Sequence, residues 1–178
     1  MNDQLREQIN QNIVLIAQGN VNALDDLSRA VSGRMLSVAQ SVLKNRTLAE
    51  DAVQEAFIKI VKYANRFDVG TNGYAWICKI TQNVALSILK REKRNKTVNI
   101  EEFFDISAAT DVFAESSAAI NLQNALSVLT EQEKQVVYQK YFMEFTVRDI
   151  AKSVGKSKSS VQRTLDSAEE KMRKYLDG

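Results

Sequence analysis

The chain has 178 residues, 44% of them hydrophobic and 26% charged, with a net charge of +2, one cysteine, no histidine and no proline. This length accommodates one medium domain or two small ones, and the composition is that of an ordinary soluble globular protein. The lone Cys78 excludes an internal disulfide and a cysteine-based zinc site, and the lack of histidine removes the commonest general base and metal ligand.

Two helices are predicted at the start of the chain. Leu5, Ile9, Ile13 and Ile16 recur at helical spacing, and Gly19-Asn20 is expected to end this first helix. The same three- and four-residue period of apolar residues continues from Ala23 to Val42 and predicts a second helix. The absence of proline favours long, uninterrupted helices here.

A third and a fourth helix follow. Thr47, with Glu50 three residues later, is expected to form a capping box that opens the third helix. Residues 67–73 predict a loop, and a long helix is predicted from about Tyr74 to Lys93. The apolar face of the third helix would consist of Ala52, Val53, Ala56, Phe57, Ile60 and Val61.

The distribution of charge divides the chain. Residues 1–96 carry 14 basic and 9 acidic residues (net +5), residues 97–133 carry no basic and 7 acidic residues (net −7), and residues 134–178 carry 10 basic and 6 acidic residues (net +4). No strand pattern is present. We therefore predict an all-α protein with an N-terminal four-helix domain (1–96), a flexible acidic linker (97–116) and a C-terminal domain (117–178). Two basic blocks held apart by an acidic one indicate two surfaces for a polyanion.

The C-terminal domain is predicted to end in a helix-turn-helix. A helical face spans residues 120–129, and Thr130 with Glu133 predicts a capping box for the next helix. Thr146 is expected to cap a short helix that ends near Val154, Gly155 marks a turn, and Ser157 caps the final helix. In such a motif Lys158, Ser159, Gln162 and Arg163 would face base edges and phosphates. The alternative is an ordinary helical hairpin with a solvated lysine face.

Two patterns in the N-terminal domain are candidates for binding. Aromatic residues at the start of the long helix and a basic run at residues 90–96 suit unstacked bases and a phosphate backbone. A buried Trp76 and a basic run that merely complements the helix C-terminus are the alternative. Asp51, Gln54, Glu55 and Ile58 share one stripe of the third helix, which is either a protein-docking face or a routinely solvated one.

Together these motifs resemble the extracytoplasmic-function group of bacterial RNA polymerase sigma factors, over nearly the whole chain. Residues 49–57, Ala-Glu-Asp-Ala-Val-Gln-Glu-Ala-Phe, are similar to the family signature Ala-Glu-Asp-x-x-Gln-Glu-x-Phe. Residues 76–83 resemble its Trp-Leu…Ile-Ala-Arg-Asn helix, with Gln82 in place of the usual arginine. Such departures concern the promoter sequence that is preferred rather than the class of protein.

The resemblance implies sigma domain 2 at residues 1–96 and sigma domain 4 at residues 117–178. The Asp51, Gln54, Glu55 and Ile58 stripe would dock on the clamp of the large subunit of core RNA polymerase, and the polymerase flap and an anti-sigma factor are further implied partners. The promoter −10 element would be opened and read by the 67–73 loop together with Tyr74, Trp76, Lys79, Asn83, Lys90, Arg91 and Arg94. The −35 element would be read by Arg148, Lys158, Ser159, Ser160, Gln162 and Arg163.

The two alternatives to a sigma factor are an autonomous regulator and an enzyme. An autonomous helix-turn-helix regulator would bind duplex DNA without polymerase. An enzyme is disfavoured because the sequence has no histidine, no cysteine pair and no glycine-rich phosphate loop. We expect no catalytic residue, no metal, no cofactor and no small-molecule substrate. The start of the chain lacks a signal-peptide pattern and no apolar run could span a bilayer, so we also expect a cytoplasmic protein without membrane insertion.

Overall fold

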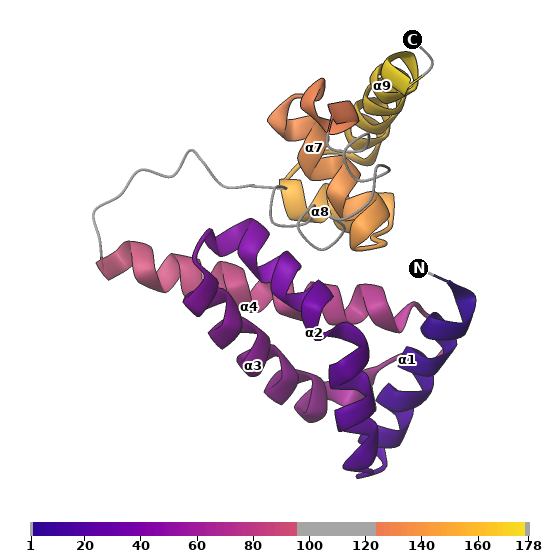
Figure 1. Cartoon of the computed structure of the whole chain (residues 1–178), viewed down its shortest axis with the longest axis vertical. Coiled ribbons are helices and arrows are strands. Elements are labelled where there is room, and N and C mark those ends of the chain that lie inside the picture. The colour runs from indigo at the N-terminus through magenta and orange to yellow at the C-terminus, as the bar shows by residue number, and fades with distance from the viewer. Residues whose placement is uncertain (1, 96–123, 177–178) are drawn as a thin grey trace. The chain divides into compact units, whose positions relative to one another are not determined.

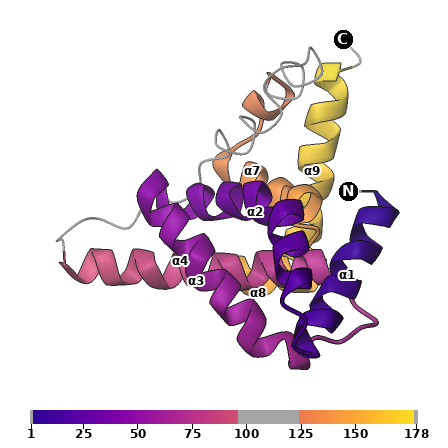
Figure 2. The same cartoon turned by 60° about the horizontal axis from the view of Figure 1, so that its bottom comes forward.

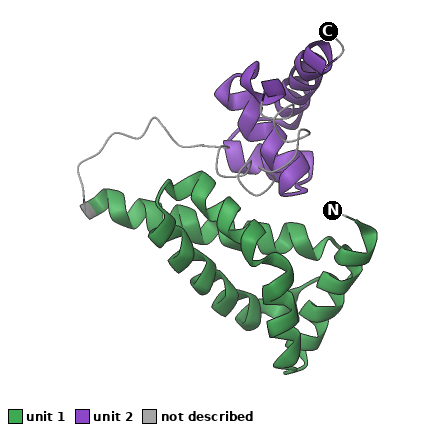
Figure 3. Cartoon of the chain, viewed as in Figure 1, with its two compact units in different colours: residues 1–105 green, residues 106–178 purple. Residues whose placement is uncertain are grey.

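The computed structural model describes residues 2–95 and 124–176, which are helical apart from short connections (Figure 1). The chain divides into two compact units, Met1–Asp105 and Ile106–Gly178 (Figure 3). The predicted linker at 97–116, and the apolar residues Ile120 and Leu122, lie outside the described residues.

The first unit contains four α-helices. They are α1 (Asp3–Ala17), α2 (Asn22–Leu43), α3 (Arg46–Tyr63) and α4 (Gly73–Asn95), with a 3-10 turn, η1 (Ala64–Arg66), after α3. The predicted end of the first helix is confirmed, since α1 stops at Ala17 and Gly19 adopts a left-handed φ of 86°. Figure 1 and Figure 2 both show α2 and α3 lying along α4, and α1 also packs on α4.

The start of α3 differs from the prediction. Asn45, not Thr47, is the N-cap: its backbone is extended and its side chain accepts a hydrogen bond of 3.0 Å from the Leu48 N–H. Glu50 pairs instead with the Arg46 side chain at 3.0 Å. Lys44 adopts a left-handed φ of 50° and ends α2 directly before Asn45. Asn45 therefore occupies the position that caps the next helix, α3.

The core of the first unit is built from one face of each helix. Its largest fully buried side chains are Ile9, Ile13, Leu27, Val31, Met35, Ile60, Tyr74 and Ile77. Val61, predicted on the apolar face of α3, is 45% exposed, because α3 buries the narrower stripe of Ala49, Ala52, Ala56 and Ile60. These alanines let α3 approach its neighbours closely.

Truncating a core residue such as Ile77 to alanine would lower the free energy of unfolding of this unit by about 2–5 kcal/mol.

The second unit contains the predicted helix-turn-helix. Residues 124–127 are helical and precede α7 (Glu131–Val137), which continues into a π-helical turn, η3 (Tyr138–Phe142). The helices α8 (Val147–Val154) and α9 (Lys158–Leu176) follow. Ile150, Val161 and Leu165 are buried between them.

The caps predicted for this unit are confirmed. The Thr130 side chain accepts from the Glu133 N–H while Glu133 accepts from the Thr130 N–H, which is a complete capping box. Thr146 caps α8, and the Ser157 hydroxyl accepts from the Ser160 N–H at 3.2 Å at the start of α9. Gly155 takes the left-handed conformation that ends α8, with φ of 66°.

Glu133 also joins α7 to α9. Its carboxylate oxygens each lie 2.8 Å from the Lys171 ammonium, and one accepts from the Ser167 hydroxyl at 2.9 Å. Burial by itself would raise the pKa of this carboxyl, but the bonds from Lys171, Thr130 and Ser167 lower the pKa from 4.5 to about 2. The ionised form is therefore stabilised by folding. That contribution is complete above about pH 4.5 and is lost as the pH falls towards 2.

We expect Glu133→Gln to lower the free energy of unfolding of the second unit by about 1–2 kcal/mol at neutral pH, since glutamine keeps the cap but loses the ion pair. Between pH 4.5 and pH 2 the wild type should lose this advantage and converge on the variant. Urea titrations followed through NMR signals of α7 and α9 amides measure both effects. Glu170→Gln, which breaks an exposed pair with Lys174, is the control and should leave the urea midpoint unchanged. A pH-independent difference between wild type and Glu133→Gln would contradict this account.

Candidate protein-docking and nucleic-acid interfaces

The predicted docking stripe lies on the outer side of α3. Asp51 and Gln54 are exposed, Glu55 is half-buried, and the Ile58 side chain is 68% exposed. Val61, three residues after Ile58, is exposed as well. Two β-branched side chains are therefore exposed to solvent on the helix that carries the Asp51 and Glu55 carboxylates. A mixed apolar and acidic face that stays exposed among the described residues of its unit is typical of a protein interface.

Two features adjoin this stripe. Glu55 forms an i,i+4 ion pair of 2.9 Å with Lys59, which an incoming basic side chain would have to displace. A groove of about 290 Å³ opens beside Gln54, between α2 and α3. It is lined by Ser32, Gly33, Leu36, Glu50, Val53 and Gln54. The stripe therefore offers a partner both charged groups and a shallow apolar groove.

The loop before α4 is internally ordered. The Asp68 carboxylate accepts from the Gly70 N–H at 3.1 Å, and its carbonyl accepts from the N–H and the hydroxyl of Thr71 at 2.9 and 2.7 Å. Asn72 caps α4 by accepting from the Ala75 N–H at 3.1 Å. This turn leaves Val69 63% exposed at its tip. The loop thus presents one apolar side chain on a hydrogen-bonded frame.

Five of the predicted −10 residues share one face of α4. At about 100° per residue they fall within a sector of about 60°. They are Trp76, Lys79, Asn83, Lys90 and Arg94, and Arg91 borders them. Trp76 is half-buried against Phe67, with ring centroids 5.5 Å apart, and Asn83, Lys90 and Arg94 are exposed. The helix therefore carries an aromatic residue beside the loop and a row of cations running away from it.

Tyr74 does not belong to this face. It lies on the opposite side of α4 with no exposed surface, and the Arg34 guanidinium is 5.6 Å from its ring centroid. Burial, followed by the neighbouring Cys78, raises the pKa of the Tyr74 hydroxyl above its usual range. This burial does not support the prediction that Tyr74 contacts the −10 element, because a side chain with no exposed surface cannot reach a base while α4 packs in the core.

The predicted −35 residues surround the start of α9. Lys158, Ser159, Gln162 and Arg163 are exposed, Ser160 is half-buried, and Arg148 is exposed on α8. The Gln162 amide donates to the Asp166 carboxylate at 2.8 Å, so this side chain must release a bond within its own helix before it pairs with a base. Arg163 and Ser160 border a polar groove of about 360 Å³ between α9 and the start of α7. Their exposure is what base and phosphate contacts require.

Both units match family models. The model for Sigma-70 region 2 matches residues 27–95, and the model for Sigma-70, region 4 matches residues 125–174. The chain belongs to the sigma-70 family, in its extracytoplasmic-function group. In this sigma factor the α3 stripe and the α4 face lie within region 2, and the helix-turn-helix lies within region 4.

Curated relatives of the same group align over most of the chain. The sigma factor SigE of Mycolicibacterium smegmatis is 24% identical over 89% of this chain, which spans 63% of that protein's length. SigW of Bacillus subtilis is 21% identical over 94% of this chain and 96% of its own. These identities support the group.

Solved structures share the fold. CnrH in complex with the cytosolic domain of CnrY has a TM-score of 0.57 at 18% identity, covering 96% of this chain and 97% of its own. RpoE from Bartonella quintana in complex with the anti-sigma factor NepR has a TM-score of 0.56 at 19% identity, covering 88% of this chain and 98% of its own.

Within the described ranges, no helix is long and apolar enough to cross a membrane.

The row of cations on α4 leads to a salt-dependence prediction. Replacing Lys90 and Arg94 by glutamine should weaken binding of promoter DNA by the sigma factor–polymerase complex and flatten the dependence of log K on log salt by about 2. Filter binding over a series of salt concentrations measures the slope. Arg46→Gln, which removes an exposed cation at the start of α3, should leave the slope at the wild-type value. An unchanged slope in the double variant would remove these two residues from the DNA interface.

The helix-turn-helix leads to a specificity prediction. Arg163→Ala should cost about 1–3 kcal/mol for the preferred −35 duplex and relax the choice of base at one position, because arginine pairs bidentately with guanine. Lys158→Ala should instead weaken all duplexes by a similar factor. Binding to a set of single-base variants of the −35 duplex distinguishes the two patterns. Uniform weakening by Arg163→Ala would make it a phosphate contact.

Proposed function

We propose that this sigma factor binds core RNA polymerase and directs it to promoters that carry a −10 and a −35 element. The observation that carries the proposal is that regions 2 and 4 each present an exposed basic helix face, on α4 and on α9. Neither surface belongs to its own unit's core. On this proposal the protein is a non-catalytic initiation factor that works in the cytoplasm, with no cofactor and no small-molecule substrate.

The three exposed surfaces, on α3, α4 and α9, have separate roles in this proposal. The α3 stripe of Asp51, Gln54, Glu55 and Ile58 docks on the clamp of the polymerase large subunit, where Ile58 supplies apolar contact and the carboxylates supply orientation. The α4 face and the preceding loop hold the opened −10 strand, with cations on phosphates and the loop beside the bases. The start of α9 reads the −35 duplex in the major groove. The second unit also contacts the polymerase flap.

An anti-sigma factor is a further proposed partner. RpoE of Bartonella quintana, which shares this fold, is described in complex with the anti-sigma factor NepR. An exposed apolar pair such as Ile58 and Val61 on α3 is the type of surface that an inhibitor would cover to prevent docking. Sequestration of this kind needs no change in the fold of either unit.

The direct test is a native-gel titration of the purified full chain with bacterial core RNA polymerase. We expect a stoichiometric complex, and we expect Asp51→Asn with Glu55→Gln to weaken it by at least about tenfold, because two charged contacts are lost while the helix is retained. The matched control is Asp25→Asn with Asp26→Asn, which changes the net charge equally on exposed positions of α2. If the Asp51 and Glu55 variant binds like wild type, the docking stripe is assigned wrongly.

The same experiment separates the two classes of function. An autonomous helix-turn-helix regulator would form no complex with core polymerase and would instead dimerise and bind palindromic duplex DNA tightly by itself. A chain that acts only with polymerase should bind duplex DNA weakly when free.

A further inference from the structure

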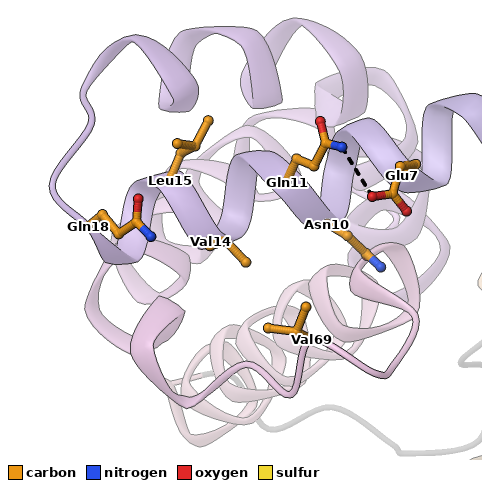
Figure 4. Close-up of a pocket in the computed structure, with 7 residues that line it drawn as sticks. All are labelled: Glu7, Asn10, Gln11, Val14, Leu15, Gln18 and Val69. Atoms are coloured by element: carbon orange, nitrogen blue, oxygen red, sulfur yellow. Dashed lines mark hydrogen bonds between the residues drawn. The ribbon is translucent and has the colours of Figure 1, made fainter.

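A single side chain of α1 holds the end of the loop that leads into α4. The Asn10 amide group donates to the Thr71 carbonyl at 3.2 Å, and its carbonyl oxygen accepts from the Gly73 N–H at 2.9 Å. These two bonds join positions more than 60 residues apart in sequence. Figure 4 shows Asn10 on the side of α1 that faces the loop carrying Val69.

The contact is so close that a side chain at position 73 would require the Asn10 and Ile13 side chains to shift. A Cβ on Gly73 would lie 2.4 Å from the Asn10 side-chain oxygen and 2.8 Å from the Ile13 methyl group. The backbone of the loop is thus pressed against α1 at the point where α4 begins.

The two ends of the loop are tied by different interactions. Phe67, at its start, is buried and packs on Trp76, and residues 71–73, at its end, are tied by Asn10. Between them Asp68 closes the turn that exposes Val69. Removing Asn10 would take away the bonds from α1 to Thr71 and Gly73, and would leave the turn at Asp68 and the Asn72 cap as the remaining constraints on this end. Ordering a free loop upon binding costs affinity, which a loop that is already ordered avoids.

We propose that Asn10 is a positioning residue for recognition of the −10 element, and that α1 thereby contributes to this recognition. This inference rests on the proposed function and assigns a role to a helix outside the matched region 2, which begins at residue 27. Asn10 acts through the backbone of residues 71–73, and the loop that it holds meets the bases. Between α1 and Val69 lies a groove of about 440 Å³, whose walls Asn10 helps to form (Figure 4).

The test uses complexes of the full chain with core polymerase. The probes are a fluorescent single strand carrying the −10 sequence that the wild-type complex enriches from a randomised promoter library, and a scrambled strand of equal length. Asn10→Ala should raise Kd for the selected strand about tenfold and leave Kd for the scrambled strand and for core polymerase within about twofold. Asn10→Asp should lose less discrimination, since its carboxylate still accepts from the Gly73 N–H.

The matched control is Gln11→Ala. Gln11 is the next residue of α1 and lines the same groove, but it is hydrogen-bonded to Glu7 at 3.1 Å rather than to the loop. It should retain the wild-type ratio of the two Kd values. As a second measurement, Gly73→Ala should be less damaging when combined with Asn10→Ala than in wild type, because the 2.4 Å clash is then absent.

Three results would overturn the inference. In the first, Asn10→Ala keeps the wild-type discrimination between the two strands. In the second, Asn10→Ala weakens core binding and both strands equally, which would make Asn10 a general stabiliser of the unit. In the third, the wild-type complex itself fails to distinguish the strands. That failure is seen before any variant is made, and it would overturn the proposed −10 function and the positioning role together.

Discussion

The first unit depends on one helix that serves both as core and as surface. Within α4, Tyr74, Ile77 and Ile88 are buried against the other helices, while the side that carries Asn83, Lys90 and Arg94 stays in water. The helical period of about 3.6 residues makes this double role possible, because residues three or four positions apart share a face and those between them lie on the other side. Since the burial of one face fixes the rotation of α4 about its axis, the packing of α1, α2 and α3 also sets the direction in which the cations point. The buried residues of α4 and its exposed cations are thus coupled through geometry.

In the second unit an ion pair between the buried Glu133 and the partly exposed Lys171 has the comparable role. Glu133 caps α7 and bonds to Lys171 and Ser167 of α9, so α9 is held by charge as well as by the buried Leu165 and Ala168. Because the Glu133 carboxylate is buried, losing its partners on α9 would leave a buried charge without compensation, which disfavours other arrangements of α7 on α9. The exposed start of α9 can then vary in sequence without loosening its attachment.

Much of the chain was predictable from local patterns. Apolar spacing located the helices, and the caps at Thr130, Thr146 and Ser157 formed as predicted because each needs only residues three positions apart. The exposure of Asp51 and Ile58 also followed from helical period and from the resemblance to sigma factors. The cap of α3 was predicted wrongly, since Asn45 is favoured by the left-handed Lys44 that precedes it. Local patterns did not reveal that conformation.

By itself, the sequence determined the all-α class, the two basic blocks with the acidic block between them, and the family, because periodicity, composition and motifs act over short distances along the chain. Only the tertiary structure decided which aromatic residue of α4 faces outward. Tyr74 and Trp76 are two residues apart, yet Tyr74 is in the core and Trp76 packs on Phe67. It also decided that Asn10 meets Gly73, a contact without a local signal since it spans 63 residues. Long-range packing selects among positions that local patterns leave equivalent, and for that reason the partners of α1 could not be predicted from sequence alone.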